Sequence, residues 1–144
     1  MCGIVALFAP RGTVSSSDLE KATRRLVARG PDGQKQWIAG HGRVGLGHAR
    51  LSIIDLQTGD QPIESEDGRT HIVVNGEFYD HERIQRELEG RGHRLRTRSD
   101  SEIALHLYQE QGASCMRELR GEFAFALWDE TNQVLFAARD RFGI

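Results

Sequence analysis

The residue with the clearest chemical potential in this 144-residue sequence is Cys2. Removal of Met1 would place a thiol and a free α-amino group on one residue, with reference pKa values of about 8.5 and about 7.7–8.0. Because the two values are nearly matched, the amine could accept the thiol proton and later return it to a leaving group. Cys2 would then be nucleophile and general base together. Position alone also allows a second interpretation, in which Cys2 is a small hydrophobic residue starting a buried strand.

The dipeptide Asn75-Gly76 also allows two interpretations. An Asn side-chain N–H and a Gly backbone N–H could form an oxyanion hole, because both can point at an oxygen that gains charge during nucleophilic attack. Gly would in addition let the main chain approach a ligand closely. Asn-Gly is, however, the strongest dipeptide signal for a type I′ hairpin turn. Taken alone, the dipeptide favours the turn.

Three further patterns favour plain structural interpretations. Residues 40–45 match G-x-G-x-x-G, but the dinucleotide fingerprint needs a following helix, and residues 46–54 continue as a strand pattern. We therefore expect a glycine-rich hairpin there. The six His residues include no pair at metal-ligand spacing, so no metal site is expected. Arg94, Arg96 and Arg98 alternate along a short expected strand, and a solvated face is favoured over an anion site.

Composition indicates one ordinary domain or a piece of a larger one. The formal net charge is −2, which gives no reason to expect nucleic acid as a partner. The longest apolar runs, residues 4–9 and 123–128, are far short of the ~18 residues needed to span a membrane, and the first lacks the features of a secretory signal. Two Cys cannot form a disulfide framework, so we expect a cytoplasmic protein.

The elements that must position the candidate residues follow from hydrophobic periodicity. Strands are expected at residues 2–9, 36–39, 43–55, 71–79, 93–97, 123–128 and 134–138. Helices are expected after the N-cap candidates at 15–18, ending at Gly30-Pro31, after Asp80, and after a capping box at 99–102. Adjacent strands interrupted by helices predict an α+β sandwich of largely antiparallel sheets, not a doubly wound parallel sheet.

Short motifs distributed over the whole chain then narrow the function. In chain order they are MCGIV (1–5), RGPDG (29–33), GHARLSIID (47–55), GDQP (59–62), VNGEFY (74–79), SDSE (99–102), LRGEFAFALWD (119–129) and ARDRFGI (138–144). Together they resemble the asparagine synthetase branch of the class II glutamine amidotransferases, whose glutaminase domain is an N-terminal-nucleophile hydrolase. The resemblance implies an αββα sandwich. It also implies that residues 1–144 form an incomplete glutaminase domain that stops before its last strands.

The resemblance assigns roles to particular residues. It places Cys2 as the nucleophile and makes Asn75 and Gly76 the oxyanion hole, in preference to a turn. Arg50 would bind the α-carboxylate of glutamine through its planar fork, and Asp100 the α-ammonium, although Asp100 could also cap a helix. The other implied ligand contacts are the backbone of Leu51, Ser52, Ile53 and Ile54, and Glu77. Supporting roles fall to residues 29–33, His48 is expected to pack beside Arg50, and Cys115 is expected to be a structural thiol.

The implied reaction is hydrolysis of L-glutamine to glutamate and ammonia through a γ-glutamyl thioester, without a cofactor. In the family the ammonia serves ATP- and Mg²⁺-dependent amidation of a carboxylate, aspartate or another acceptor, in a synthetase domain or subunit. No Ser-Gly-Gly-x-Asp-Ser loop occurs in these residues, so that domain is expected to be absent from this chain. A homodimer is left open. The alternatives are a noncatalytic docking or assembly domain derived from a glutaminase, and a hydrolase of another small amide.

Overall fold

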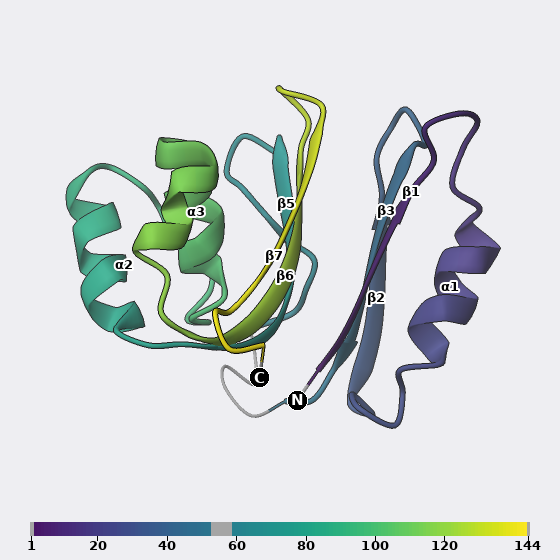
Figure 1. Cartoon of the computed structure of the whole chain (residues 1–144), viewed down its shortest axis with the longest axis horizontal. Coiled ribbons are helices and arrows are strands. Elements are labelled where there is room, and N and C mark those ends of the chain that lie inside the picture. The colour runs from purple at the N-terminus through teal and green to yellow at the C-terminus, as the bar shows by residue number, and fades with distance from the viewer. Residues whose placement is uncertain (1, 53–58, 144) are drawn as a thin grey trace.

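Two antiparallel sheets packed face to face form the centre of the structure, with helices on both outer sides (Figure 1). The computed structural model describes residues 2–52 and 59–143. Helix α1 (Ser16–Arg24) covers the first sheet, whereas α2 (His81–Gly90) and α3 (Glu102–Gln111) cover the second. A short 3-10 helix, η1 (Gly112–Arg117), follows α3. The predicted αββα sandwich of antiparallel sheets is confirmed.

The strands of each sheet pair antiparallel throughout the described registers. The first sheet has the order β1-β3-β2, made of β1 (Gly3–Phe8), β3 (Val44–Arg50) and β2 (Gly33–Ile38). The second has the order β4-β5-β6-β7, made of β4 (Ile63–Glu64), β5 (Thr70–Phe78), β6 (Gly121–Asp129) and β7 (Val134–Arg139). The expected β6–β7 hairpin is therefore present.

Glycines in β3 explain how α1 lies so close to the first sheet. A Cβ atom at Gly47 would lie 2.2 Å from Thr23 Oγ1, and one at Gly45 would lie 3.0 Å from Leu19 Cδ2. The glycine-rich residues 40–45 lie at the hairpin that connects β2 to β3, in which the Ala39 N–H donates to the Val44 carbonyl. A strand follows the G-x-G-x-x-G match instead of a helix, as the sequence pattern predicted.

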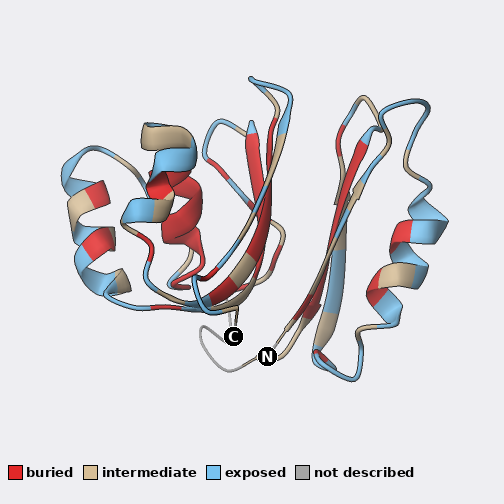
Figure 2. Ribbon diagram, in the orientation of Figure 1, coloured by how far each residue is buried: buried red, intermediate tan, exposed pale blue. Residues whose placement is uncertain are grey.

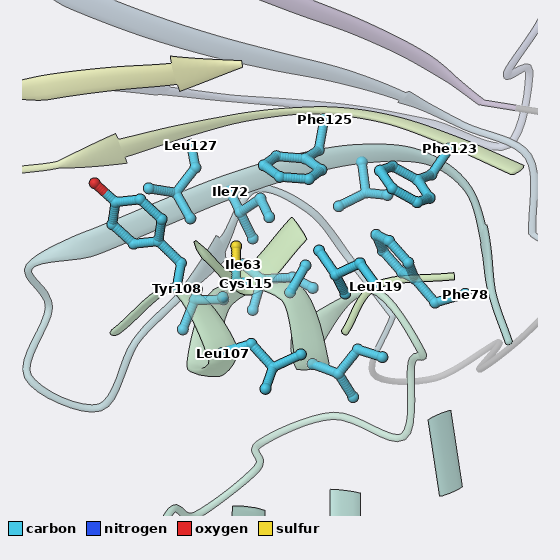
Figure 3. Close-up of a cluster of buried hydrophobic side chains, with 14 of the residues drawn as sticks. Ile63, Ile72, Phe78, Leu107, Tyr108, Cys115, Leu119, Phe123, Phe125 and Leu127 are labelled. Carbon is cyan, nitrogen blue, oxygen red and sulfur yellow. The ribbon is translucent and has the colours of Figure 1, made fainter. Parts of the chain in front are cut away.

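Two hydrophobic clusters hold the layers together. One lies between the second sheet and its helices and contains Phe78, Phe123 and Phe125 (Figure 3). The other lies between the sheets and includes Leu46, Val73 and Trp128. The buried residues of the helices lie on the sides that face the sheets, while the outer sides of the helices are exposed (Figure 2). No helix within the described residues is long and apolar enough to cross a membrane.

The expected strand at 93–97 and the capping box at 99–102 are both wrong, for one reason. The Glu102 carboxylate accepts hydrogen bonds from the backbone N–H groups of Arg96 and Thr97, at 2.8 and 2.7 Å, and from the Thr97 hydroxyl. These donors are therefore not available to a strand ladder, and Glu102 does not reach back to Ser99. Helix α3 has Ser101 at its N-cap instead.

The end of α1 also differs from the expectation, whereas α2 begins after Asp80 as predicted. The Ser15 hydroxyl caps α1 by accepting from Asp18 N–H, as predicted, but the helix ends at Arg24 and not at Gly30. Turns with i to i+3 hydrogen bonds fill residues 25–29. Asp80 lies at the N-cap of α2 with φ of 58° and makes no side-chain cap bond among the described residues.

Candidate active site

A cavity of about 260 Å³ lies where Cys2, the end of β3, β5 and the segment before α3 meet, and we call it the Cys2 cavity. Six of the predicted site residues line it: Cys2, Arg50, Leu51, Gly76, Glu77 and Asp100. Ser52 and Asn75 are not among the described residues of its lining. Ile53 and Ile54 lie outside the described residues. The fold thus brings segments from four distant parts of the chain to one cavity.

The Cys2 thiol is held at this cavity by the chain that follows β3. The Leu51 N–H donates to Cys2 Sγ at 3.4 Å, and the thiol donates to the Leu51 carbonyl at 3.7 Å. Arg29 Nε donates to the Cys2 carbonyl at 3.2 Å. Cys115 is different, because it is buried in the core cluster and burial raises the pKa of its thiol to about 11. Of the two cysteines, Cys2 is therefore the one that lines the Cys2 cavity.

The segment RGPDG (29–33) supports the chain around Cys2. In addition to the Arg29 contact, the Asp32 carboxylate accepts from Ser52 N–H at 2.7 Å. A Cβ atom at Gly30 would lie 2.1 Å from the Ala49 carbonyl oxygen, so only glycine permits this approach to β3. The supporting role expected for this segment agrees with these contacts.

Asn75 and Gly76 lie inside β5 opposite Ala124 and Phe123, so the hairpin-turn interpretation is wrong. Gly76 has φ of 147°, and a Cβ atom there would lie 2.1 Å from the Glu122 carbonyl oxygen. Glycine is thus required by the close approach of β6. Side chains alternate along a strand, so Asn75 lies on the β5 face that carries Val73 and faces the first sheet. Its buried Oδ1 has no hydrogen-bond partner among the described residues.

Arg50 is held by a carboxylate that the sequence patterns did not single out. Its Nη1 donates to Asp60 Oδ1 at 2.7 Å, and Lys35 Nζ donates to the other oxygen at 2.6 Å. The hydrogen bond from Lys35, with a further one from Arg50, lowers the pKa of Asp60. Asp60 and Lys35 line a second cavity of about 200 Å³ that Arg50 also lines, whereas Asp60 is not in the described lining of the Cys2 cavity. Asp60 therefore binds Arg50 on the side of the second cavity.

Asp100 lines the Cys2 cavity and is almost fully buried. Its Oδ2 accepts from Phe78 N–H at 2.6 Å, and Oδ1 accepts from the Ser99 hydroxyl at 3.4 Å. Because Ser101 is the N-cap of α3, Asp100 is not the capping residue that the sequence also allowed. Its carboxylate instead ties the α3 entry to the end of β5.

The described lining of the Cys2 cavity has one positive and three negative side chains. The charged side chains in its described lining are those of Arg50, Glu77, Asp100 and Glu122. Glu77 and Glu122 lie directly opposite each other on β5 and β6, and Tyr79 donates its hydroxyl to Glu122 at 3.1 Å. A molecule with a negative and a positive end would match this arrangement. Within residues 2–52 and 59–143, no group of three His, Cys, Asp or Glu could hold a metal ion.

His48 lies beside Arg50 as expected, and it is a neutral part of the site. The pKa of His48 is lowered from 6.5 to about 4, mainly by burial and in part by the charge of Arg50, while the hydrogen bond with the Val74 backbone and the charge of Asp60 partly offset these effects. Its Nε2 is buried and has no hydrogen-bond partner in the described part of the chain. At neutral pH the imidazole is therefore uncharged.

This burial predicts an acid-dependent loss of stability that His48→Gln reduces. The unfolded chain takes up a proton on His48 near pH 6.5 and the folded chain only near pH 4, so acid favours unfolding in that window. The free energy of unfolding of the wild-type chain falls between pH 7 and pH 4, and in His48→Gln this fall should be smaller by about 3 kcal/mol. Urea unfolding at both pH values measures this, with His81→Gln as the control for losing a histidine. An unchanged fall in His48→Gln would contradict the assignment.

This chain resembles known proteins over its whole length. A family model described as a glutamine amidotransferase domain matches residues 1–144. Over its whole length the chain is 45% identical to the amidase chry2 of Gibberella zeae and 40% identical to asparagine synthetase (glutamine-hydrolyzing) 3 of Bacillus subtilis. It spans 23% and 24% of these two proteins, about a quarter of their length.

The fold is also similar to a solved structure. Glutamine phosphoribosylpyrophosphate amidotransferase from B. subtilis, in complex with ADP and GMP, aligns with 90% of this chain and 35% of its own, with a TM-score of 0.70 and 16% identity. At this identity the likeness concerns the fold alone, and it confirms the sandwich that the sequence predicted.

Proposed function

Because this chain belongs to the family of glutamine amidotransferase domains, we propose that its Cys2 cavity binds L-glutamine and that Cys2 hydrolyses the side-chain amide to glutamate and ammonia. The observation that carries this proposal is that one cavity brings the Cys2 thiol together with Arg50 and Asp100. Free glutamine has a carboxylate and an ammonium at one end and a neutral amide at the other. A cation, an acid and a nucleophile around a cavity of this size suit that molecule.

Both charged groups of glutamine have a matching partner in the described residues. Arg50 offers N–H donors to the α-carboxylate, while Asp60 holds its Nη1 from the far side. Asp100 offers a buried carboxylate to the α-ammonium, and Glu77 adds negative charge at the same cavity. These contacts would leave the amide end of glutamine toward Cys2.

In the proposed reaction, the Cys2 sulfur attacks the amide carbon after its proton passes to the α-amine exposed by removal of Met1. Negative charge then develops on the amide oxygen. The Gly76 N–H and the Asn75 side chain are its proposed donors. The amine returns the proton to nitrogen, the carbon–nitrogen bond breaks, and ammonia leaves a γ-glutamyl thioester. Water then attacks the thioester, which releases glutamate and restores the thiol.

The fate of the ammonia is part of the same proposal. The curated relatives named above are about four times longer than this chain, and one is named an asparagine synthetase. Ammonia would therefore serve amidation of a carboxylate, aspartate or another acceptor, in a synthetase domain or subunit that uses ATP and Mg²⁺. Hydrolysis of glutamine at the Cys2 cavity requires neither of them.

The direct test measures ammonia and glutamate released from L-glutamine by the purified chain, with asparagine and simple amides as comparison substrates. Equal amounts of both products, with a clear preference for glutamine, are expected. Similar turnover of other amides would indicate a different small-amide hydrolase. If protein that is shown to lack Met1 binds glutamine specifically but does not hydrolyse it, the domain is noncatalytic.

Arg50→Ala should raise the KM for glutamine about 10- to 100-fold and change kcat much less. Charge-assisted hydrogen bonds to a carboxylate contribute about 1.5–3 kcal/mol, and this contact exists in the bound substrate as well as in the transition state. Arg50→Lys should recover only part of the loss, since Lys lacks the planar fork. Steady-state kinetics measures both effects, with Arg43→Ala on the β2–β3 hairpin as the control. A normal KM in Arg50→Ala would refute the role.

A further inference from the structure

Gln61 is a buried polar residue of the Cys2 cavity that the proposed reaction does not use. It is 5% exposed, and its side chain lies between two parts of the site. Its Oε1 accepts a hydrogen bond from the Val74 N–H at 2.6 Å, and its Nε2 donates to the Ser101 hydroxyl oxygen at 3.4 Å. Both ends of the amide are thus engaged by the protein.

The contact with Val74 replaces a missing strand partner. Strand β4 pairs with β5 only at Ile63–Ile72 and Glu64–His71 in the described register. Continuing that register would place Gln61 opposite Val74. Pro62, however, lies between Gln61 and the first paired residue, Ile63, and it has no N–H with which to extend the hydrogen-bond ladder. The Gln61 side chain supplies the acceptor that a longer β4 would have provided. Val74 itself is 1% exposed, so water does not readily take this place.

The two partners of Gln61 adjoin the residues with proposed roles in the reaction. Val74 immediately precedes the proposed oxyanion donors Asn75 and Gly76, and Ser101 immediately follows Asp100. Asp100 makes a second connection between the same elements, through Phe78 N–H. Gln61 therefore links the start of α3 to the middle of β5, whereas Asp100 links it to the end of β5.

We propose that Gln61 is a positioning residue that fixes the oxyanion donors on β5 relative to Asp100. This inference rests on the proposed glutamine hydrolysis. Hydrogen-bond donors that point at a developing oxyanion stabilise it much less when they shift by about 1 Å or even less. Because Gln61 acts through the backbone of Val74, its loss should lower kcat more than it raises KM.

The test compares three variants by steady-state kinetics with L-glutamine. Gln61→Met keeps the size of the side chain and removes both hydrogen bonds, and kcat should fall about 10- to 100-fold with KM within about threefold of wild type. Gln61→Glu keeps an oxygen acceptor for Val74 and should recover most of kcat. Gln85→Met is the matched control, since Gln85 donates to the neighbouring Ser99 carbonyl and does not contact Val74 in the described structure. It should retain kcat within about threefold.

Hydrogen exchange of backbone amides provides a measurement that does not depend on activity. In the wild-type chain the Val74 amide should exchange as slowly as that of Leu127 in the centre of the second sheet, although β4 does not reach it. A fast Val74 amide would overturn the proposal, as would an unchanged kcat in Gln61→Met or an equal loss in Gln85→Met. If wild type releases no ammonia while Val74 is protected, the proposed reaction fails and the Gln61 contact stands.

Discussion

Cys2→Ala should abolish ammonia release from glutamine, with kcat reduced at least about 10⁴-fold, and leave the fold intact. The thiol is the proposed nucleophile, and loss of the nucleophile removes the covalent route while the oxyanion donors and substrate contacts remain. Cys2 lies before β1, and the described thiol contacts are the two weak ones with Leu51. Its truncation should therefore change the free energy of unfolding by less than about 1 kcal/mol.

Cys115→Ala is the matched control for this variant, because it removes the other cysteine of the chain. Cys115 is fully buried in the core cluster, so the change should lower stability and leave kcat near the wild-type value. Ammonia and glutamate release measure activity, and urea unfolding measures stability. Unchanged ammonia release in Cys2→Ala would refute the nucleophile assignment.

Asn75→Ala should lower kcat about 10²- to 10³-fold, which is the usual cost of removing one oxyanion donor. The Gly76 N–H would remain as the second donor, so activity should not disappear. The stability cost should be small, since the buried Oδ1 of Asn75 has no partner in the described structure that would be left unpaired. Such a pattern would separate a catalytic role of Asn75 from a structural one.

Kinetics with saturating glutamine measures this effect on kcat directly. Asn132→Ala is a suitable control, because Asn132 donates its side-chain amide to Asp129 in the β6–β7 loop. That change should affect stability and not kcat. If Asn75→Ala instead raised KM at unchanged kcat, Asn75 would contact the ground-state substrate and not the oxyanion.

The layered fold could be predicted from the sequence because its signals are local. Continuous apolar runs mark β1 and β6, and the strand pattern after residue 45 excludes the helix that a dinucleotide site needs. The end of α1 was less predictable. Its i to i+3 turns over residues 25–29 tighten the backbone well before the Gly30-Pro31 stop signal.

The segment at 93–102 shows where local patterns fail. The pattern at 93–97 favours a strand and SDSE at 99–102 favours a capping box, and each interpretation is reasonable by itself. In the structure, Glu102 binds the Arg96 and Thr97 N–H groups, which excludes both. Both local patterns are incompatible with the hydrogen bonds of the Glu102 side chain. Neither pattern contains information about those bonds.

For the active site, residue types were easier to predict than their partners. The motifs predicted Cys2, Arg50 and Asp100 as site residues, and the structure places these three residues at one cavity. Asp60 and Gln61 lie within the noted GDQP motif, yet neither was given a role. Their partners, including Lys35 and Ser101, are 25 and 40 residues away in sequence, so only the folded chain brings them together.

The central claim is that Cys2 is the residue that attacks the amide of glutamine. Its most direct test is intact-mass and peptide analysis of the chain after reaction with a glutamine analogue that carries an electrophilic diazoketone in place of the amide. The proposed mechanism predicts one adduct per chain, on Cys2 of protein that lacks Met1, and protection by excess L-glutamine. An adduct on Cys115, or no adduct in chain that still hydrolyses glutamine, would contradict it.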